Sequence, residues 1–141
     1  MKHFKLEEFK CQCGCTIPEE VKVNLTALVE NVLDPARAKL NIPVMVNSGY
    51  RCPKHNKSVG GALNSQHCKG EAADITTRSS AGNLLAARLI EHHGRFDQMI
   101  LYVEDITMNP RFLHIRHNPQ GPNRHQILKK VIGKSGYQQI A

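Results

Sequence analysis

The order of helix-like and strand-like patterns is the feature that most limits the folds open to this chain. Apolar residues fall at helical spacing between Pro18 and Asn41, and again between Ser80 and Gly94. Other segments have the apolar and β-branched character of short strands, namely Val44–Val46, Glu71–Thr76, Gln98–Val103 and Phe112–Arg116. Because helices and strands mix without regular alternation, we predict an α+β fold with a small antiparallel sheet and helices packed on one side.

The ends of the predicted helices follow from local residue chemistry. Pro35 lacks an N–H group and should kink or restart the first helix, with Asp34 as a candidate N-cap. Ser79 or Ser80 should cap the second helix. The segment Ile127–Ile132 fits a helix and a strand equally well.

The length of 141 residues suits one domain with a single core. We expect residues 1–141 to form that domain, with 1–16 as a Cys-rich segment that wraps the surface and about 17–128 as the core. No window approaches the roughly 20 apolar residues of a membrane span. The N-terminus also has no apolar run typical of a signal peptide, so we expect synthesis in the cytoplasm. A monomer is the simplest expectation.

The net charge of +7 favours polyanionic partners such as nucleic acid, an anionic membrane or an acidic wall polymer. Only 5% of the residues are aromatic, and no basic motif is interleaved with aromatic side chains for base stacking. We therefore expect no nucleic-acid partner.

The five cysteines stand at positions 11, 13, 15, 52 and 68. An odd number without a signal peptide argues against a disulfide framework. The one-residue gaps between Cys11, Cys13 and Cys15 differ from the two-to-four-residue gaps of structural zinc sites. Free thiols are therefore the favoured interpretation for these three residues, and a bound metal is the alternative.

The strongest chemical signal is a histidine and an aspartate that flank a glycine turn. His67 lies in a polar loop, Gly70 permits a tight turn, and Asp74 falls on a predicted strand. Imidazole nitrogen and carboxylate oxygen are both good zinc ligands, but two ligands hold zinc poorly. The third candidate is His114 or His117, which face opposite sides of a regular strand, and His114 lies in its apolar part.

A longer set of residues resembles the peptidase M15 family, in particular its M15_3 branch. The resemblance spans roughly Phe4 to Leu128 and is most specific between Ser48 and Asp74. The matching residues are 47–52, 55–56, 59–62, 65–67, Gly70 and 73–74, followed by 96–98, 112–115 and 123–124.

The resemblance implies an α+β fold shared with the hedgehog signalling domain, and one Zn²⁺ per chain held by His67, Asp74 and His114. It also implies that Arg51 binds substrate and stabilises the developing oxyanion, and that Ser65 lies beside the metal. Three protein ligands would leave the fourth position open for water, as catalytic zinc requires.

The function implied by the resemblance is hydrolysis of an amide bond in peptidoglycan stem peptides, next to a D-amino acid. The enzyme would be a D-alanyl-D-alanine carboxypeptidase or an endolysin-type endopeptidase. Acting on the wall after cytoplasmic synthesis would require lysis or export, which fits a phage or prophage origin. The alternative is a catalytically inactive, zinc-containing wall-binding module of the same fold.

The general base is where this chain departs from the family pattern. Many relatives place an acid three positions before the last histidine ligand, where this chain has Arg111. The nearest upstream carboxylates are Glu104 and Asp105, and His117 is another candidate. We favour Glu104. The missing acid is the reason to consider the inactive module.

Overall fold

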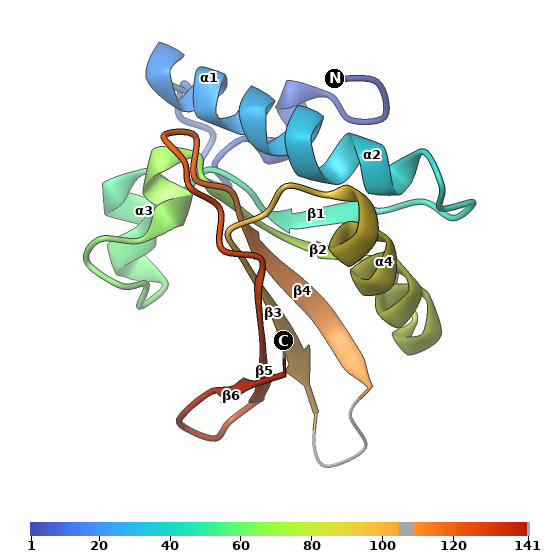
Figure 1. The fold of residues 1–141 in the computed structure, drawn as a ribbon. Helices are drawn as coiled ribbons and strands as arrows, with labels where there is room; N and C mark the ends of the chain where they lie inside the picture. The colour runs from blue at the N-terminus through green and yellow to red at the C-terminus, as the bar shows by residue number, and fades with distance from the viewer. Residues whose placement is uncertain (105–108, 141) are drawn as a thin grey trace.

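The computed structural model describes residues 1–104 and 109–140, and a six-stranded sheet lies at its centre (Figure 1). The strand order is β1-β2-β4-β3-β5-β6. The strands are β1 Met45–Ser48, β2 Ala72–Thr76, β3 Gln98–Val103, β4 Pro110–Arg116, β5 Gln126–Val131 and β6 Gln138–Gln139. The β3–β5 pair is parallel and the other pairs of the sheet are antiparallel. The α+β prediction is confirmed.

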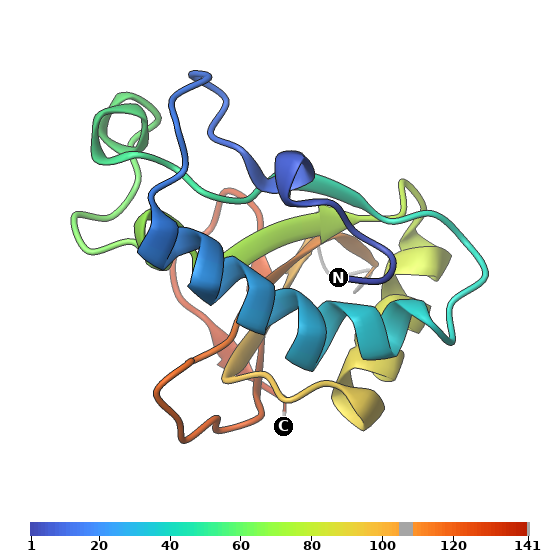
Figure 2. The ribbon, with the colours of Figure 1, turned by 90° about the horizontal axis from the view of Figure 1, so that it is seen from above.

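Most of the helical residues lie on one side of this sheet. The helices are α1 Glu19–Leu28, α2 Asp34–Arg37, α3 Pro53–Ser58 and α4 Ser80–His93. Three short turns add to them: the 3₁₀ helices η1 Leu6–Phe9 and η3 Gln66–Lys69, and the π-helix η2 Val29–Leu33. Helices α1, α2 and α4 cover the same face of the sheet, whereas α3 lies apart from them (Figures 1 and 2). Ser79 caps α4 through its side chain, as predicted.

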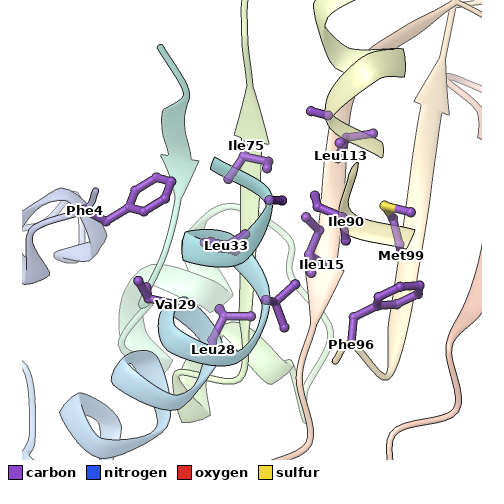
Figure 3. Close-up of a cluster of buried hydrophobic side chains, with 14 of the residues drawn as sticks. Phe4, Leu28, Val29, Leu33, Ile75, Ile90, Phe96, Met99, Leu113 and Ile115 are labelled. Carbon is purple, nitrogen blue, oxygen red and sulfur yellow. The ribbon is translucent and has the colours of Figure 1, made fainter. Parts of the chain in front are cut away.

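The core forms where the apolar side of the sheet meets those helices (Figure 3). Ile75 of β2 is paired with Leu113 of β4, and Met99 of β3 with Ile115 of β4. All four side chains are buried with Leu28, Val29, Leu33, Ile90 and Phe96. Since alternate strand residues face opposite sides, the residues between these four point away from the helices.

The first long helix changes its hydrogen bonding just before Pro35. A proline ring has no N–H group, so the carbonyl of Asn31 receives no α-helical hydrogen bond from position 35. The backbone N–H of Arg95 donates to that carbonyl instead, at 2.9 Å. The π-helical turn η2 lies at this interruption. The prediction that the helix is interrupted near Pro35 is therefore confirmed.

Two details of this prediction were wrong. Asp34 does not cap α2, because its carboxylate accepts hydrogen bonds from the backbone N–H groups of Lys2 and His3 at 2.7 and 3.0 Å. The helix also ends at Arg37 rather than near Asn41.

The N-terminal segment is mostly exposed, as a surface segment would be, but three of its side chains reach the core. Phe4, Phe9 and Cys11 are buried. The backbone N–H of Tyr50 donates to the Phe9 carbonyl at 2.8 Å. A Cβ atom added to Gly49 would lie 2.6 Å from the Phe9 Cα, so only glycine permits this close approach.

Most of the segment Ile127–Ile132 is a strand, because each residue of β5 pairs with a residue of β3. Asp97 fixes the start of β3 beside it, by accepting hydrogen bonds from Arg116 at 2.7 Å and Arg124 at 2.9 Å. Burial raises the pKa of the Asp97 carboxyl, but the hydrogen bonds from Arg124 and Arg116 outweigh it and lower that pKa to about 2. None of the described helices is long and apolar enough to cross a membrane.

The close approach at Gly49 generates a stability prediction. In Gly49→Ala, the new methyl group would meet backbone atoms of Phe9, which cannot move aside as a flexible side chain can. We expect a loss of about 1–3 kcal/mol in the free energy of unfolding. Urea unfolding followed by circular dichroism measures it, and a midpoint equal to that of wild type would contradict this account of the packing.

Candidate metal centre

His67, Asp74 and His114 come together on the sheet side that faces away from the helices. One ligand atom from each lies within 4.8 Å of the other two. Asp74 stands directly opposite His114 in the β2–β4 ladder, so the two side chains share a face. His67 belongs to η3, which leads into β2 and places its ring beside them. The structure therefore brings together the three predicted ligands.

The turn around His67 is held by close packing. Ser65 caps η3, with its Oγ accepting from the His67 backbone N–H at 3.2 Å. Gly70 ends the turn in the left-handed conformation, with φ of 74°. A Cβ atom there would lie 2.7 Å from the carbonyl oxygen of Val21 in α1, so this turn admits only glycine.

A second contact fixes the orientation of the His67 ring. The ring Nδ1 lies 2.8 Å from the Gly49 carbonyl oxygen, and a carbonyl can only accept, so Nδ1 donates. The other nitrogen, Nε2, faces the cluster and lies 3.4 Å from Oδ2 of Asp74. Metal-binding histidines commonly donate their remote N–H to a backbone carbonyl in this way.

Asp74 supplies the negative charge of the cluster. Its Oδ1 lies 2.8 Å from Nδ1 of His114, and the two histidine rings lie 5.2 Å apart between centroids. Burial raises the pKa of the Asp74 carboxyl, but the hydrogen bonds with His114 and His67 outweigh it and hold that pKa well below its usual range. The group at the centre of the cluster is therefore an ionised carboxylate.

This donor set fits zinc. Zinc binds histidine nitrogen and carboxylate oxygen at about 2.0–2.2 Å, which places tetrahedral ligand atoms about 3.4 Å apart. The 3.4 Å between Nε2 of His67 and Oδ2 of Asp74 matches that spacing, whereas the 2.8 Å between Nδ1 of His114 and Oδ1 of Asp74 is the shorter distance of a direct hydrogen bond. His67 is 3% exposed, and Asp74 and His114 are also largely covered, so the ligands are held in place by packing.

The cluster opens into a cleft of about 500 Å³ that Arg51 and Ser65 also line. The Arg51 backbone N–H donates to the His67 carbonyl at 3.1 Å. Among the described residues, the buried Nε of Arg51 has no hydrogen-bond partner. Arg51 therefore lines the cleft with a guanidinium group of which one N–H is buried and unpaired.

The candidates for the general base are not brought to this cleft. Glu104 stands just after β3, its side chain is 65% exposed, and it lies 3.7 Å from Arg111 in a neighbouring hollow. His117 is buried and donates from Nδ1 to the Arg95 carbonyl at 2.7 Å, in a third cavity. Asp105 lies outside the described residues. The assignment of Glu104 stays a prediction.

Several lining residues were not foreseen. Tyr102 of β3 stacks on Phe112 of β4, with ring centroids 4.5 Å apart and planes 9° apart. Burial and the neighbouring Tyr137 raise the pKa of the Tyr102 hydroxyl, so it stays protonated and able to donate at neutral pH. Strand alternation could have found Gln98 and Tyr102, because they share a face of β3. Tyr137 gives no such signal, because it reaches the cleft from the irregular segment after β5.

Comparisons with known proteins identify the family of this chain. A family model described as Peptidase M15 matches residues 2–116, which confirms the resemblance. The zinc D-Ala-D-Ala carboxypeptidase of Streptomyces albus G is 42% identical over 52 residues, which are 37% of this chain and 20% of that protein's length. The L-Ala D-Glu endopeptidase ChiX of Serratia marcescens aligns with a TM-score of 0.48 and 16% identity, over 74% of this chain and 90% of that one. The chain belongs to the peptidase M15 family.

Proposed function

We propose that this chain is a zinc metallopeptidase that hydrolyses an amide bond of a peptidoglycan stem peptide, next to a D-amino acid. One zinc ion would bind to His67, Asp74 and His114. The observation that carries the proposal is the convergence of their three ligand atoms within 4.8 Å in an open cleft. Three protein donors leave one coordination position free, which distinguishes catalytic from structural zinc sites.

Different residues around that ion would have different roles. Zinc, when bound, supplies a Lewis acid that activates water and polarises a carbonyl group. Gly49 holds the imidazole of His67 in the orientation that keeps Nε2 free to bind. The depressed pKa of Asp74 keeps its carboxylate ionised, and therefore able to bind a cation, at neutral pH. Arg51, which lines the cleft, would place its guanidinium group beside the amide oxygen as that oxygen gains negative charge.

The substrate class rests on the chemistry of the cleft and on the relatives. The Streptomyces protein is named for cleavage between two D-alanine residues. Next to the polar metal ligands, Tyr102, Phe112 and Leu128 give the cleft an apolar wall that suits the small methyl groups of alanine. The net charge of +7 also favours approach to an acidic wall polymer.

One observation favours the second candidate, an inactive wall-binding module. Among residues 1–104 and 109–140, Asp74 is the only carboxylate that lines the cleft, so no acid stands ready there as a general base. Such a module would bind zinc and peptidoglycan without cutting either the wall or its peptides.

Removal of one ligand tests the metal centre. We expect His114→Ala to lose one equivalent of zinc and to lower cleavage by about 1,000-fold or more, because two ligands hold zinc poorly. Metal analysis and mass spectrometry of digested peptidoglycan and of a synthetic stem pentapeptide measure both effects. His93→Ala, an exposed histidine at the end of α4, is the control and should match wild type.

The products of that digestion also identify the bond. Release of a terminal D-alanine indicates a carboxypeptidase, whereas cutting within the stem or the cross-link indicates an endopeptidase. Zinc-loaded wild-type protein that leaves both substrates uncut would contradict a peptidase and support the binding module.

The role of Arg51 predicts a specific kinetic change. Arg51→Ala should lower kcat by about 100-fold to 1,000-fold while zinc content stays at the wild-type level, because the lost donor acts on the developing oxyanion. Lys54→Ala removes an exposed positive charge three positions away and serves as the control. Equal kcat values for Arg51→Ala and wild type would exclude this role.

A separate variant tests whether Glu104 is the general base. If Glu104 is the base, Glu104→Gln should lower kcat by about 100-fold or more and leave zinc binding unchanged. Turnover at the wild-type rate would reject Glu104, in keeping with its position outside the cleft. Circular dichroism of the variant checks that the fold is retained.

A further inference from the structure

A second cluster of metal-binding side chains lies outside the cleft. The Sγ atoms of Cys11, Cys13, Cys15 and Cys52 lie within 4.8 Å of one another. The Sγ atoms lie 3.3 Å apart in Cys13 and Cys11, 3.6 Å apart in Cys13 and Cys52, and 3.8 Å apart in Cys11 and Cys52. These distances far exceed the roughly 2.05 Å of a disulfide bond, and all the cysteines are free.

The spacing of these sulfur atoms is that of a four-thiolate metal site. Zinc binds thiolate sulfur at about 2.3 Å, so the corners of a zinc–sulfur tetrahedron lie about 3.8 Å apart. We propose that Cys11, Cys13, Cys15 and Cys52 together bind one zinc ion as a closed structural site. Four protein ligands would leave no position for water, unlike the centre in the cleft.

The local chain geometry explains how one-residue gaps can supply three ligands. Gly14 adopts φ of 81°, and its N–H donates to the Cys11 carbonyl at 2.9 Å, so the chain turns sharply between the cysteines. That turn carries Cys13 and Cys15 back beside Cys11. The fourth ligand, Cys52, follows β1 in the chain. The spacing of the first three cysteines does not predict it.

Backbone donors already face the sulfur atoms. The Cys52 N–H donates to Sγ of Cys11 at 3.4 Å, and the His55 N–H donates to Sγ of Cys52 at 3.4 Å. Such hydrogen bonds stabilise negative charge on sulfur, which the thiolates of a metal site carry. Cys68, the fifth cysteine, is not part of the cluster and provides an internal control.

The position of this site gives it a structural role. Cys52 directly follows Arg51, and Tyr50 is hydrogen-bonded to Phe9 of the N-terminal segment. A zinc ion here would join that segment to the loop that carries Arg51 into the cleft. The site does not depend on peptidase activity.

Metal content separates the two centres. Protein purified in the presence of a reductant should contain two zinc ions per chain, and His114→Ala should contain one. In the His114→Ala background, Cys52→Ser should lose the remaining zinc, whereas Cys68→Ser should keep it. If the cleft binds no zinc, His114→Ala changes nothing while Cys52→Ser still removes an ion, so failure of the proposed function is recognised separately.

Cobalt substitution reports the ligand type without relying on the folding of a cysteine variant. Cobalt-loaded wild type and His114→Ala should both show intense sulfur-to-cobalt charge-transfer absorption in the near ultraviolet. Removing the metal with a chelator should also lower Tm by about 10 °C or more, because structural zinc contributes to folding. Absence of that absorption, or disulfides among the four cysteines in alkylated, reductant-purified protein, would overturn the proposal.

Discussion

The pairing of β2 with β4 is the constraint on which the rest of the structure depends. In this ladder Ile75 lies opposite Leu113 on the helix side, and Asp74 lies opposite His114 on the cleft side. A slip of β2 by one residue would turn the Asp74 carboxylate into the apolar core and move Ile75 to the cleft side. The burial that stabilises the sheet therefore also determines which side chains can meet at the candidate metal centre.

The centre itself combines charged and polar groups that packing keeps in place. A carboxylate shielded from water is costly unless it is paired, and here two imidazole nitrogens face Asp74. The third side chain, His67, belongs to a short turn that Ser65 caps and that Gly70 ends against α1. These contacts come from the backbone and close packing rather than from exposed side chains, so the position of the His67 ring is fixed by the fold.

Much of this arrangement could be predicted from the sequence, and the reasons are physical. Strand alternation placed His114 on one face, and the glycine at position 70 marked the turn that returns His67 toward Asp74. The prediction for Asp34 was wrong because an aspartate before a proline is typical of a helix N-cap, whereas here its carboxylate accepts from the N–H groups of Lys2 and His3. Two positions were not predicted: Cys52 in the cysteine cluster and Tyr137 in the cleft. Each is brought there by tertiary packing, which the local spacing of residues does not predict.

The segment 49–52 explains how distant parts of the chain act on one site. Each of its residues makes a different connection. The Gly49 carbonyl orients the His67 ring, the Tyr50 N–H binds Phe9, and the Arg51 N–H binds the His67 carbonyl. Cys52 then joins the N-terminal cysteines. Four consecutive residues of one backbone thus connect the cysteine cluster to the ring of His67, a candidate metal ligand. The N-terminal segment thus supports the geometry of the cleft without lining it.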